Sequence, residues 1–129
     1  MKTETPPVML FSATDEDVIF AECRSLKVDL SAAMQIVADR LEFTHQKKHY
    51  FVCDLSKVQS VTAEAKKYLQ HPDGGLKNIL GAALIASNPV AALIANVFVK
   101  TPKDFQARFF SNRKDAFDWI HARKQKSLT

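Results

Sequence analysis

Glycine and cysteine are scarce in this chain, and their scarcity excludes several kinds of functional site. The 129 residues include only Gly74, Gly75 and Gly81 as glycines. No glycine-rich loop is therefore available to cradle a nucleotide phosphate, and Gly74-Gly75 follows a predicted helix rather than a strand. The two cysteines, Cys23 and Cys53, each lie inside an apolar, strand-like run. We expect reduced thiols in the core, since disulfides are uncommon in the cytosol.

Charge is absent from one long segment, residues 79–99, which read ILGAALIASNPVAALIANVFV. A membrane-spanning helix needs about 20 residues of this kind. Pro89 interrupts such a helix because proline lacks a backbone donor and restricts the residue before it. Ser87 or Asn88 as N-cap, with Pro89 at the first helical position, is instead a favourable helix start. We therefore predict a buried strand over 79–86 and a helix over 89–99.

Residues with catalytic or metal-binding chemistry form no recognisable constellation. His45 and His49 are four residues apart, but they straddle a helix end and a strand start across Lys47-Lys48. Cationic neighbours make this a poor metal site, and no spacing forces two carboxylates together. A nucleophilic Cys–His pair stays open as an alternative, although a central-strand position for Cys53 argues against it. We expect a non-enzymatic protein with no metal and no cofactor.

Positive charge is concentrated in the carboxyl-terminal half, where it could attract an acidic partner. Residues 1–60 carry 7 basic and 9 acidic side chains, and residues 61–129 carry 11 and 5. The basic residues are spread over several elements and interrupted by Asp115 and Asp118, without a nucleic-acid-binding motif. We expect no nucleic-acid partner. The amino terminus lacks the basic-then-apolar pattern of a signal peptide, which predicts a cytoplasmic location.

Strand and helix patterns alternate along the chain. The predicted elements are a hairpin over 8–13 and 18–24, a helix from Ser31 to about Gln46, a strand over 49–55, a helix over 62–71, the strand and helix of 79–99, a strand over 105–110 and a helix over 113–125. The apolar stripe of the first helix is predicted to be Ala33, Ile36, Val37 and Leu41, with Met34 beside it. This order predicts an α/β fold with a mostly parallel, mixed sheet of about five strands, an amino-terminal β-hairpin and about four helices. We expect a single domain over 1–129 with flexible tails at 1–7 and 125–129.

Residues 51–69, FVCDLSKVQSVTAEAKKYL, resemble the central segment of STAS domains, the family of the anti-sigma-factor antagonists. In that family an apolar strand leads into Asp-Leu-Ser-Gly-Val, and Asp-Ser-Ser-Gly then opens a helix. Asp54, Leu55, Ser56 and Val58 match the first half. Residues 96–100, 109–110 and 116–120 are similar to a subgroup of uncharacterised bacterial proteins with a SpoIIAA-like fold. The resemblance covers nearly the whole chain and implies a regulatory module that binds other proteins.

The chain departs from the family at the serine or threonine that a kinase phosphorylates. The four positions of Asp-Ser-Ser-Gly fall on residues 62–65, Thr-Ala-Glu-Ala, so the acceptor hydroxyl is missing. Thr62 and Glu64 suit plain helix capping, because hydroxyl and carboxylate oxygens are favourable at a helix amino terminus. Alternatively, Glu64 imitates a permanent phosphate, or Ser56, Ser60 or Thr62 has become the acceptor. We take these four residues as a candidate partner-binding loop.

The predicted helix over 89–99 is apolar around most of its circumference, whereas a surface helix normally has one apolar stripe. The strand over 105–110 and the amino-terminal strand could cover its outer side. Otherwise this side is a protein interface, with a second copy of the chain as one partner, or one wall of a groove for a small apolar ligand or lipid. The similarity of STAS domains to the lipid-binding Sec14-like domain adds to the ligand hypothesis. The candidate residues here are Asn88, Leu93, Asn96, Val97 and Phe98.

Overall fold

Strands and helices alternate along the chain, as the sequence predicts. The computed structural model describes residues 9–14, 17–24, 26–98 and 107–128. In chain order, the elements are β1 (Met9–Ala13), β2 (Val18–Cys23), β3 (Lys27–Val28), α1 (Leu30–Phe43), β4 (His49–Asp54), β5 (Ser60–Val61), α2 (Ala63–Leu69), β6 (Ile79–Ile85), α3 (Pro89–Phe98), β7 (Ala107–Phe110) and α4 (Arg113–Leu128).

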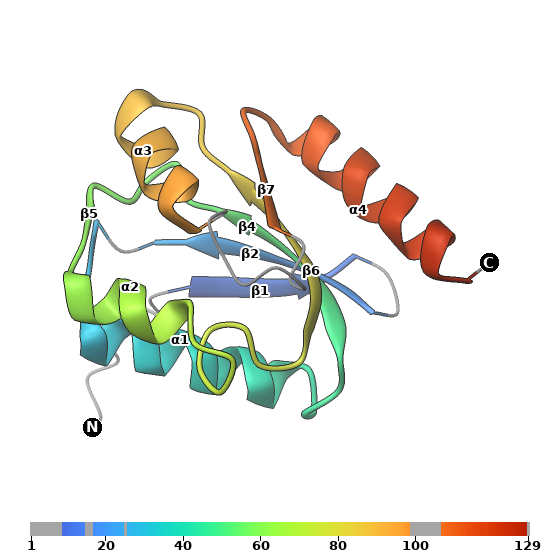
Figure 1. Ribbon diagram of the computed structural model, residues 1–129, viewed down its shortest axis with the longest axis horizontal. Coiled ribbons are helices and arrows are strands. Elements are labelled where there is room, and N and C mark those ends of the chain that lie inside the picture. Colours follow the sequence, from blue (N-terminus) through green and yellow to red (C-terminus); the bar gives the residue numbers. More distant parts are fainter. Residues whose placement is uncertain (1–8, 15–16, 25, 99–106, 129) are drawn as a thin grey trace, which may run out of the picture.

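The described strands form a mixed five-stranded sheet in the order β1-β2-β4-β6-β7 (Figure 1), beside a small ladder of β3 and β5. The hairpin strands β1 and β2 pair antiparallel, whereas β2, β4, β6 and β7 are parallel to one another. The predicted α/β fold, with its amino-terminal hairpin, five-stranded sheet and four helices, is confirmed for the described residues.

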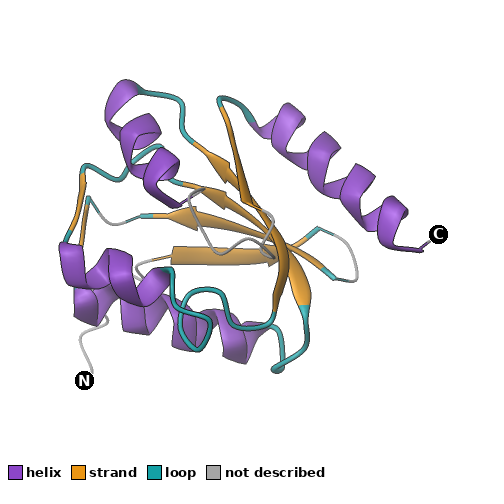
Figure 2. Ribbon diagram, viewed as in Figure 1, coloured by secondary structure: helices purple, strands orange, loops and turns teal. Residues whose placement is uncertain are grey.

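The strand order determines which face of the sheet each helix covers. From β2 to β7 every crossover moves in the same direction across the sheet, and right-handed crossovers then place α1, α2 and α3 on one face. Helix α4 follows the last strand and packs on the opposite face, so the helices enclose the sheet (Figure 2). The central strand β4 is therefore buried along its whole length.

Each face of the sheet has its own apolar core. In β2, Ile19 and Cys23 point into the core beneath α1, α2 and α3, while Val18 points into the core beneath α4. Cys23 and Cys53 are free thiols buried in the first core. Burial raises the pKa of the Cys53 thiol well above its usual value, because a thiolate is poorly solvated there.

The charge-free segment divides as predicted into a strand and a helix. β6 is buried from Gly81 to Ile85, and α3 begins at Pro89. Asn88 is its N-cap, since Asn88 Oδ1 accepts a hydrogen bond of 2.9 Å from the Ala91 N–H. Among the helices of the described residues, none has both the length and the apolar composition needed to cross a bilayer.

The predictions for the first helix were wrong in two respects. Helix α1 begins at Leu30 and not at Ser31, because the Asp29 carboxylate caps it by accepting from the Ala32 N–H at 2.8 Å. It ends at Phe43 rather than Gln46, since residues 45 and 46 have positive φ angles that end a helix. The predicted stripe also needs correction: Arg40 is buried, Leu41 is half-buried and Met34 is exposed.

The predicted carboxyl-terminal helix was too short. Helix α4 continues to Leu128, beyond the predicted end at residue 125. Asn112 caps it through its Oδ1, which accepts from the Asp115 N–H at 2.9 Å. The predicted tail at 1–7, and positions 99, 105 and 106 of the predicted helix and strand, lie outside the described residues.

The contact of α4 with the sheet predicts a large effect of Ile120→Ala. Ile120 is fully buried in the second core, so we expect this substitution to lower the free energy of unfolding by about 2–5 kcal/mol through lost burial and a new cavity. Urea denaturation measures the change. Gln125→Ala on the exposed side of the same helix is the control, with an expected change within about 0.5 kcal/mol. Equal stabilities of the two variants would contradict the observed packing of α4.

Candidate functional site

The parallel strands place a group of polar residues at one edge of the sheet. Glu22 pairs in register with Asp54, Asp54 with Ile85, and Ile85 with Phe110. The carboxyl ends of these strands are therefore level, and the loops that follow them meet. In open α/β sheets, ligands and partners commonly bind outside this edge of the strands.

Backbone hydrogen bonds hold the loop between β4 and α2, residues 55–62, in place. The Gln59 and Ser60 N–H groups both donate to Leu26 O, at 2.7 and 3.1 Å, and the Thr62 N–H donates to Val28 O at 3.0 Å. Its apolar side chains Leu55 and Val58 are buried in the core. Lys57, Gln59 and Ser60 are consequently turned outward and exposed.

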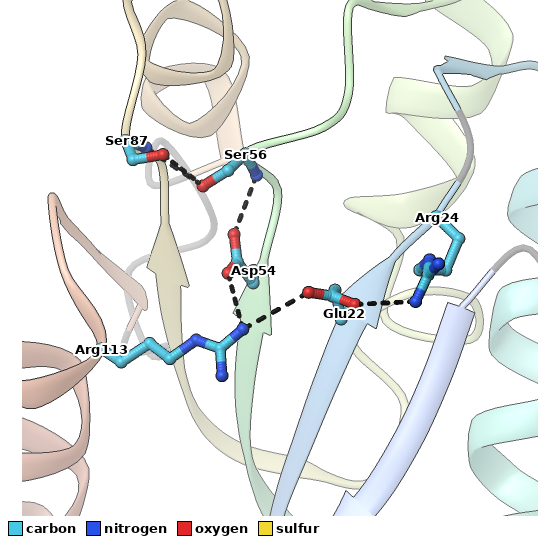
Figure 3. A network of polar contacts seen from close by, with 6 residues as sticks. All are labelled: Glu22, Arg24, Asp54, Ser56, Ser87 and Arg113. Atoms are coloured by element: carbon cyan, nitrogen blue, oxygen red, sulfur yellow. Dashed lines mark hydrogen bonds and ion pairs between the residues drawn. The ribbon is translucent and has the colours of Figure 1, made fainter.

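Ser56 joins this loop to the start of α3 (Figure 3). Its hydroxyl oxygen accepts hydrogen bonds from the Ser87 hydroxyl at 2.8 Å and from the Ser87 N–H at 3.2 Å. The Asn88 side-chain amide donates to Ser56 O at 2.6 Å, while its oxygen caps α3. The structure thus brings together Ser56 and Asn88, which the sequence predicted as parts of separate sites.

A row of alternating charges lies beside this contact. The Asp54 carboxylate accepts from the Ser56 N–H at 2.9 Å and lies 3.4 Å from Arg113 Nη2. The same nitrogen is 3.4 Å from Glu22, which also pairs with Arg24 at 3.2 Å (Figure 3). Arg113 lies over the Phe20 ring at 4.6 Å, a cation–π contact that fixes its direction. The two carboxylates are therefore neutralised by two arginines.

The other three predicted loop residues lie at the start of α2. Thr62 is the N-cap, because its Oγ1 accepts from the Ala65 N–H at 3.2 Å. Glu64 is exposed in the first helical turn, where the unpaired N–H groups favour a carboxylate. Ser60 is exposed in β5. The structure confirms the predicted cap at Thr62.

Within the described residues, only the inner side of helix α3 is covered by the rest of the protein. Ala91, Ile94 and Ala95 pack in the core, whereas Leu93 is 72% exposed and Asn96 is also exposed. β7 lies beside α3 and leaves this outer side open. The side chains of Val97 and Phe98 lie outside the described part of the structure.

An apolar cavity of about 100 Å³ lies between the sheet and the helices α1, α2 and α3. We call it the inner cavity. Ile36, Leu69 and Ile94 line it from the helices, Phe51 and Leu84 from the sheet, and Gly75 and Leu76 from the loop before β6. From α3, Ile94 lines this cavity, whereas the predicted groove residues Asn88, Leu93 and Asn96 do not.

The polar edge lacks the geometry of a nucleophilic site among the described residues. Ser56 Oγ is bonded to Ser87, and the nearby Asp54 carboxylate receives the backbone N–H of Ser56 rather than its hydroxyl. A nucleophilic serine needs a base at its hydroxyl. The described residues also contain no group of three or more His, Cys, Asp or Glu side chains arranged to hold a metal ion. The contacts described at this edge are hydrogen bonds and ion pairs.

Several residues of the edge were not predicted as site residues. Glu22, Asp54, Ser87 and Arg113 come from four separate segments. The first three lie at the ends of predicted strands, and carboxyl ends of parallel strands meet at one edge. That rule could have found them. Arg113 carries no comparable signal, because its position depends on how α4 leaves β7.

Comparison with known proteins gives first the class of fold and then the family. The structure resembles the crystal structure of an uncharacterised DUF3478-family protein with a SpoIIAA-like fold from Shewanella loihica PV-4, with a TM-score of 0.61 and 17% identity. The match covers 93% of this chain and 99% of that one. The fold is therefore SpoIIAA-like, as the sequence predicted. Residues 11–124 match the model of the domain of unknown function DUF7793, and the chain belongs to that family. No curated protein matches the chain.

The cap at Thr62 predicts a specific loss of stability. Thr62→Ala removes the acceptor for the Ala65 N–H, and we expect it to lower the free energy of unfolding by about 0.5–2 kcal/mol. Thr62→Ser retains the oxygen and should stay within a few tenths of a kcal/mol of the parent, as about equal N-cap preferences predict. Urea denaturation compares the three proteins. If the alanine and serine variants were equally stable, Thr62 would not act as a cap.

Proposed function

We propose that this protein is a non-enzymatic regulatory module that binds a protein partner through Ser56, Ser60, Thr62 and Glu64. We call these four residues the partner surface. The observation that carries the proposal is the loop of residues 55–62, whose backbone is bonded to Leu26 and Val28 while Lys57, Gln59 and Ser60 are exposed. A loop ordered before binding loses little conformational entropy when it binds, so its contacts contribute more fully to affinity.

The partner surface carries a permanent negative charge in this proposal. Glu64 is exposed at the amino end of α2, the position at which a phosphate would be favourable for the same electrostatic reason. Thr62 Oγ1 already accepts the hydrogen bond that caps the helix. Glu64 would therefore pair with a cationic side chain of the partner without prior phosphorylation.

The outer side of α3 extends this surface with apolar contacts. Asn88 at the start of α3 is bonded to Ser56, so the two segments are adjacent. Val90 and Leu93 are exposed on α3, 47% and 72% respectively, and Asn96 is exposed one turn further. An apolar centre with polar neighbours is the usual composition of a protein interface. Val97 and Phe98 belong to the proposed interface by their sequence positions alone.

A charge reversal tests the proposal. The partner is captured by crosslinking to the full chain, identified and purified, and its Kd is then measured for each variant. We expect Glu64→Lys to weaken binding at least about tenfold, which corresponds to about 1.4 kcal/mol. Asp118→Lys is the matched control, since Asp118 is an exposed carboxylate on α4 at the opposite face. It should leave the Kd unchanged.

Two outcomes of this experiment are decisive for the partner surface. If Glu64→Lys and the parent bound the partner with the same Kd, the partner surface would not take part in the interaction. A dimer mass for the purified chain alone, lost in Glu64→Lys but kept in Asp118→Lys, would identify the partner as a second copy of this chain.

The inner cavity favours a second candidate function, a carrier or sensor of a small apolar molecule. Its walls are almost entirely apolar, and a dry cavity of comparable size, about 150 Å³, can hold benzene. We expect benzene to shift the methyl NMR signals of Leu84 and Ile94. Ala82→Leu should abolish these shifts by filling the cavity, since Ala82 lines it. Unchanged spectra of the parent protein with benzene would contradict this function.

A further inference from the structure

Arg40 is a buried cation held by neutral groups. It lies on α1 with 1% of its surface exposed, and its guanidinium lies 5.6 Å from the centre of the Phe51 ring. Nη1 donates to Lys77 O at 2.9 Å, and Nη2 donates to Gly75 O at 3.1 Å. Nη1 is also 3.0 Å from His49 Nε2. Burial lowers the pKa of Arg40 to about 10, so the group is still charged at neutral pH.

The contact between Arg40 and His49 requires a neutral imidazole. His49 Nδ1 is 2.9 Å from Lys47 O, a carbonyl that can only accept, so Nδ1 carries the hydrogen. Nε2 is then the acceptor for the Arg40 N–H. A second proton on Nε2 would remove this acceptor and place two positive charges 3.0 Å apart.

The carbonyls that Arg40 binds belong to a segment beside the inner cavity. Residues 70–78 connect α2 to β6 and pass alongside α1 (Figure 2), and we call them the α2–β6 loop. Gly75 and Leu76 of this loop line the inner cavity. Asn78 of this loop also bonds to residues at and before the start of β4. Asn78 O accepts from the His49 N–H at 2.9 Å, and the Asn78 side-chain amide donates to Gln46 O at 3.0 Å. Arg40 thus holds the part of the loop that forms one wall of the cavity.

We propose that Arg40 is a latch that holds the α2–β6 loop in its closed position as one wall of the inner cavity, and that protonation of His49 in acid opens it. The inference goes beyond the proposed partner surface and does not depend on it. Closed and open states differ in whether Arg40 retains its acceptors Gly75 O and Lys77 O, while the sheet stays folded in both.

The direction of the pH effect follows from the surroundings of His49. Burial, and then the charge of Arg40, lower the pKa of His49 below its ordinary value of 6.5, although the bond to Lys47 O opposes them. The closed state therefore binds the proton more weakly than an open state with an ordinary imidazole. The ratio of closed to open loop should fall by up to about tenfold for each pH unit below 6.5, until the pH reaches the lowered pKa.

Other titratable groups near the latch are few in the described residues. Cys53 on β4 and Tyr68 on α2 interact with the Arg40 charge, and Lys47 precedes His49 with an exposed side chain. His71 lies in the loop itself, where its Nδ1 accepts from the Asp73 N–H at 3.1 Å. His71 is therefore the rival source of a pH response, and the test must separate it from His49.

Hydrogen exchange followed by mass spectrometry tests the latch on the full chain. At about pH 5.5 compared with about pH 7.5, after correction for intrinsic rates, we expect amides of residues 70–78 to lose up to about tenfold in protection. Amides of β4 and β6 that do not donate to this loop, those of residues 50–54 and 80–85, should keep theirs. His49→Gln places a neutral acceptor near Nε2 and should abolish the change. His71→Gln, the matched control, should retain it.

Three results would overturn the latch. These are loop protection that is independent of pH in the parent, a pH response that persists in His49→Gln, and an equal loss of protection in β4, which would indicate general unfolding. If His49→Gln failed to fold, NMR titration of the parent would decide the question. The His49 imidazole and the loop amides must then titrate at the same midpoint, and different midpoints would contradict the proposal.

Discussion

The burial of β4 on both faces is the constraint on which the other features of this structure depend. Its six residues are all buried, and two of them, His49 and Asp54, are polar and lie at opposite ends of the strand. A buried polar group is costly unless it has hydrogen-bond partners. His49 obtains them from Arg40 and Lys47, and Asp54 from Ser56 and Arg113. Each end of the central strand therefore fixes the loops around it.

Much of the fold could be predicted because its signals are local. The run of apolar residues in β6, the cap at Asn88 and the proline at the start of α3 lie within a few positions of one another, and capping acts over three residues. The β3–β5 ladder was not predicted, since two residues per strand are too few to show a pattern. The burial of Arg40 did have a signal. Position 40 continues the helical spacing of Ile36 and Val37, but an arginine there is normally assigned to the surface.

The candidate site was less predictable, because its contacts join distant segments. Ser56 was proposed from a motif, yet its partners Ser87 and Asn88 lie more than thirty positions away. The contact between them depends on β4 and β6 being neighbours with their ends level, which a single sequence does not specify. The same reasoning applies to Arg113, whose contacts with Glu22 and Asp54 span 91 and 59 positions.

The two ends of β4 differ in how they should respond to conditions. At the carboxyl end, the Asp54 and Glu22 carboxylates are paired with arginine. At the amino end, an arginine faces a histidine, the side chain whose ordinary pKa lies closest to neutrality. The end beside the inner cavity therefore holds the pair on which the proposed latch depends, whereas the edge beside the proposed partner surface holds carboxylate–arginine pairs. Because the sheet stays folded in both states of the proposed latch, its opening would leave the proposed partner surface in place. In these proposals, partner binding at one end of β4 and access to the cavity at the other would be controlled independently.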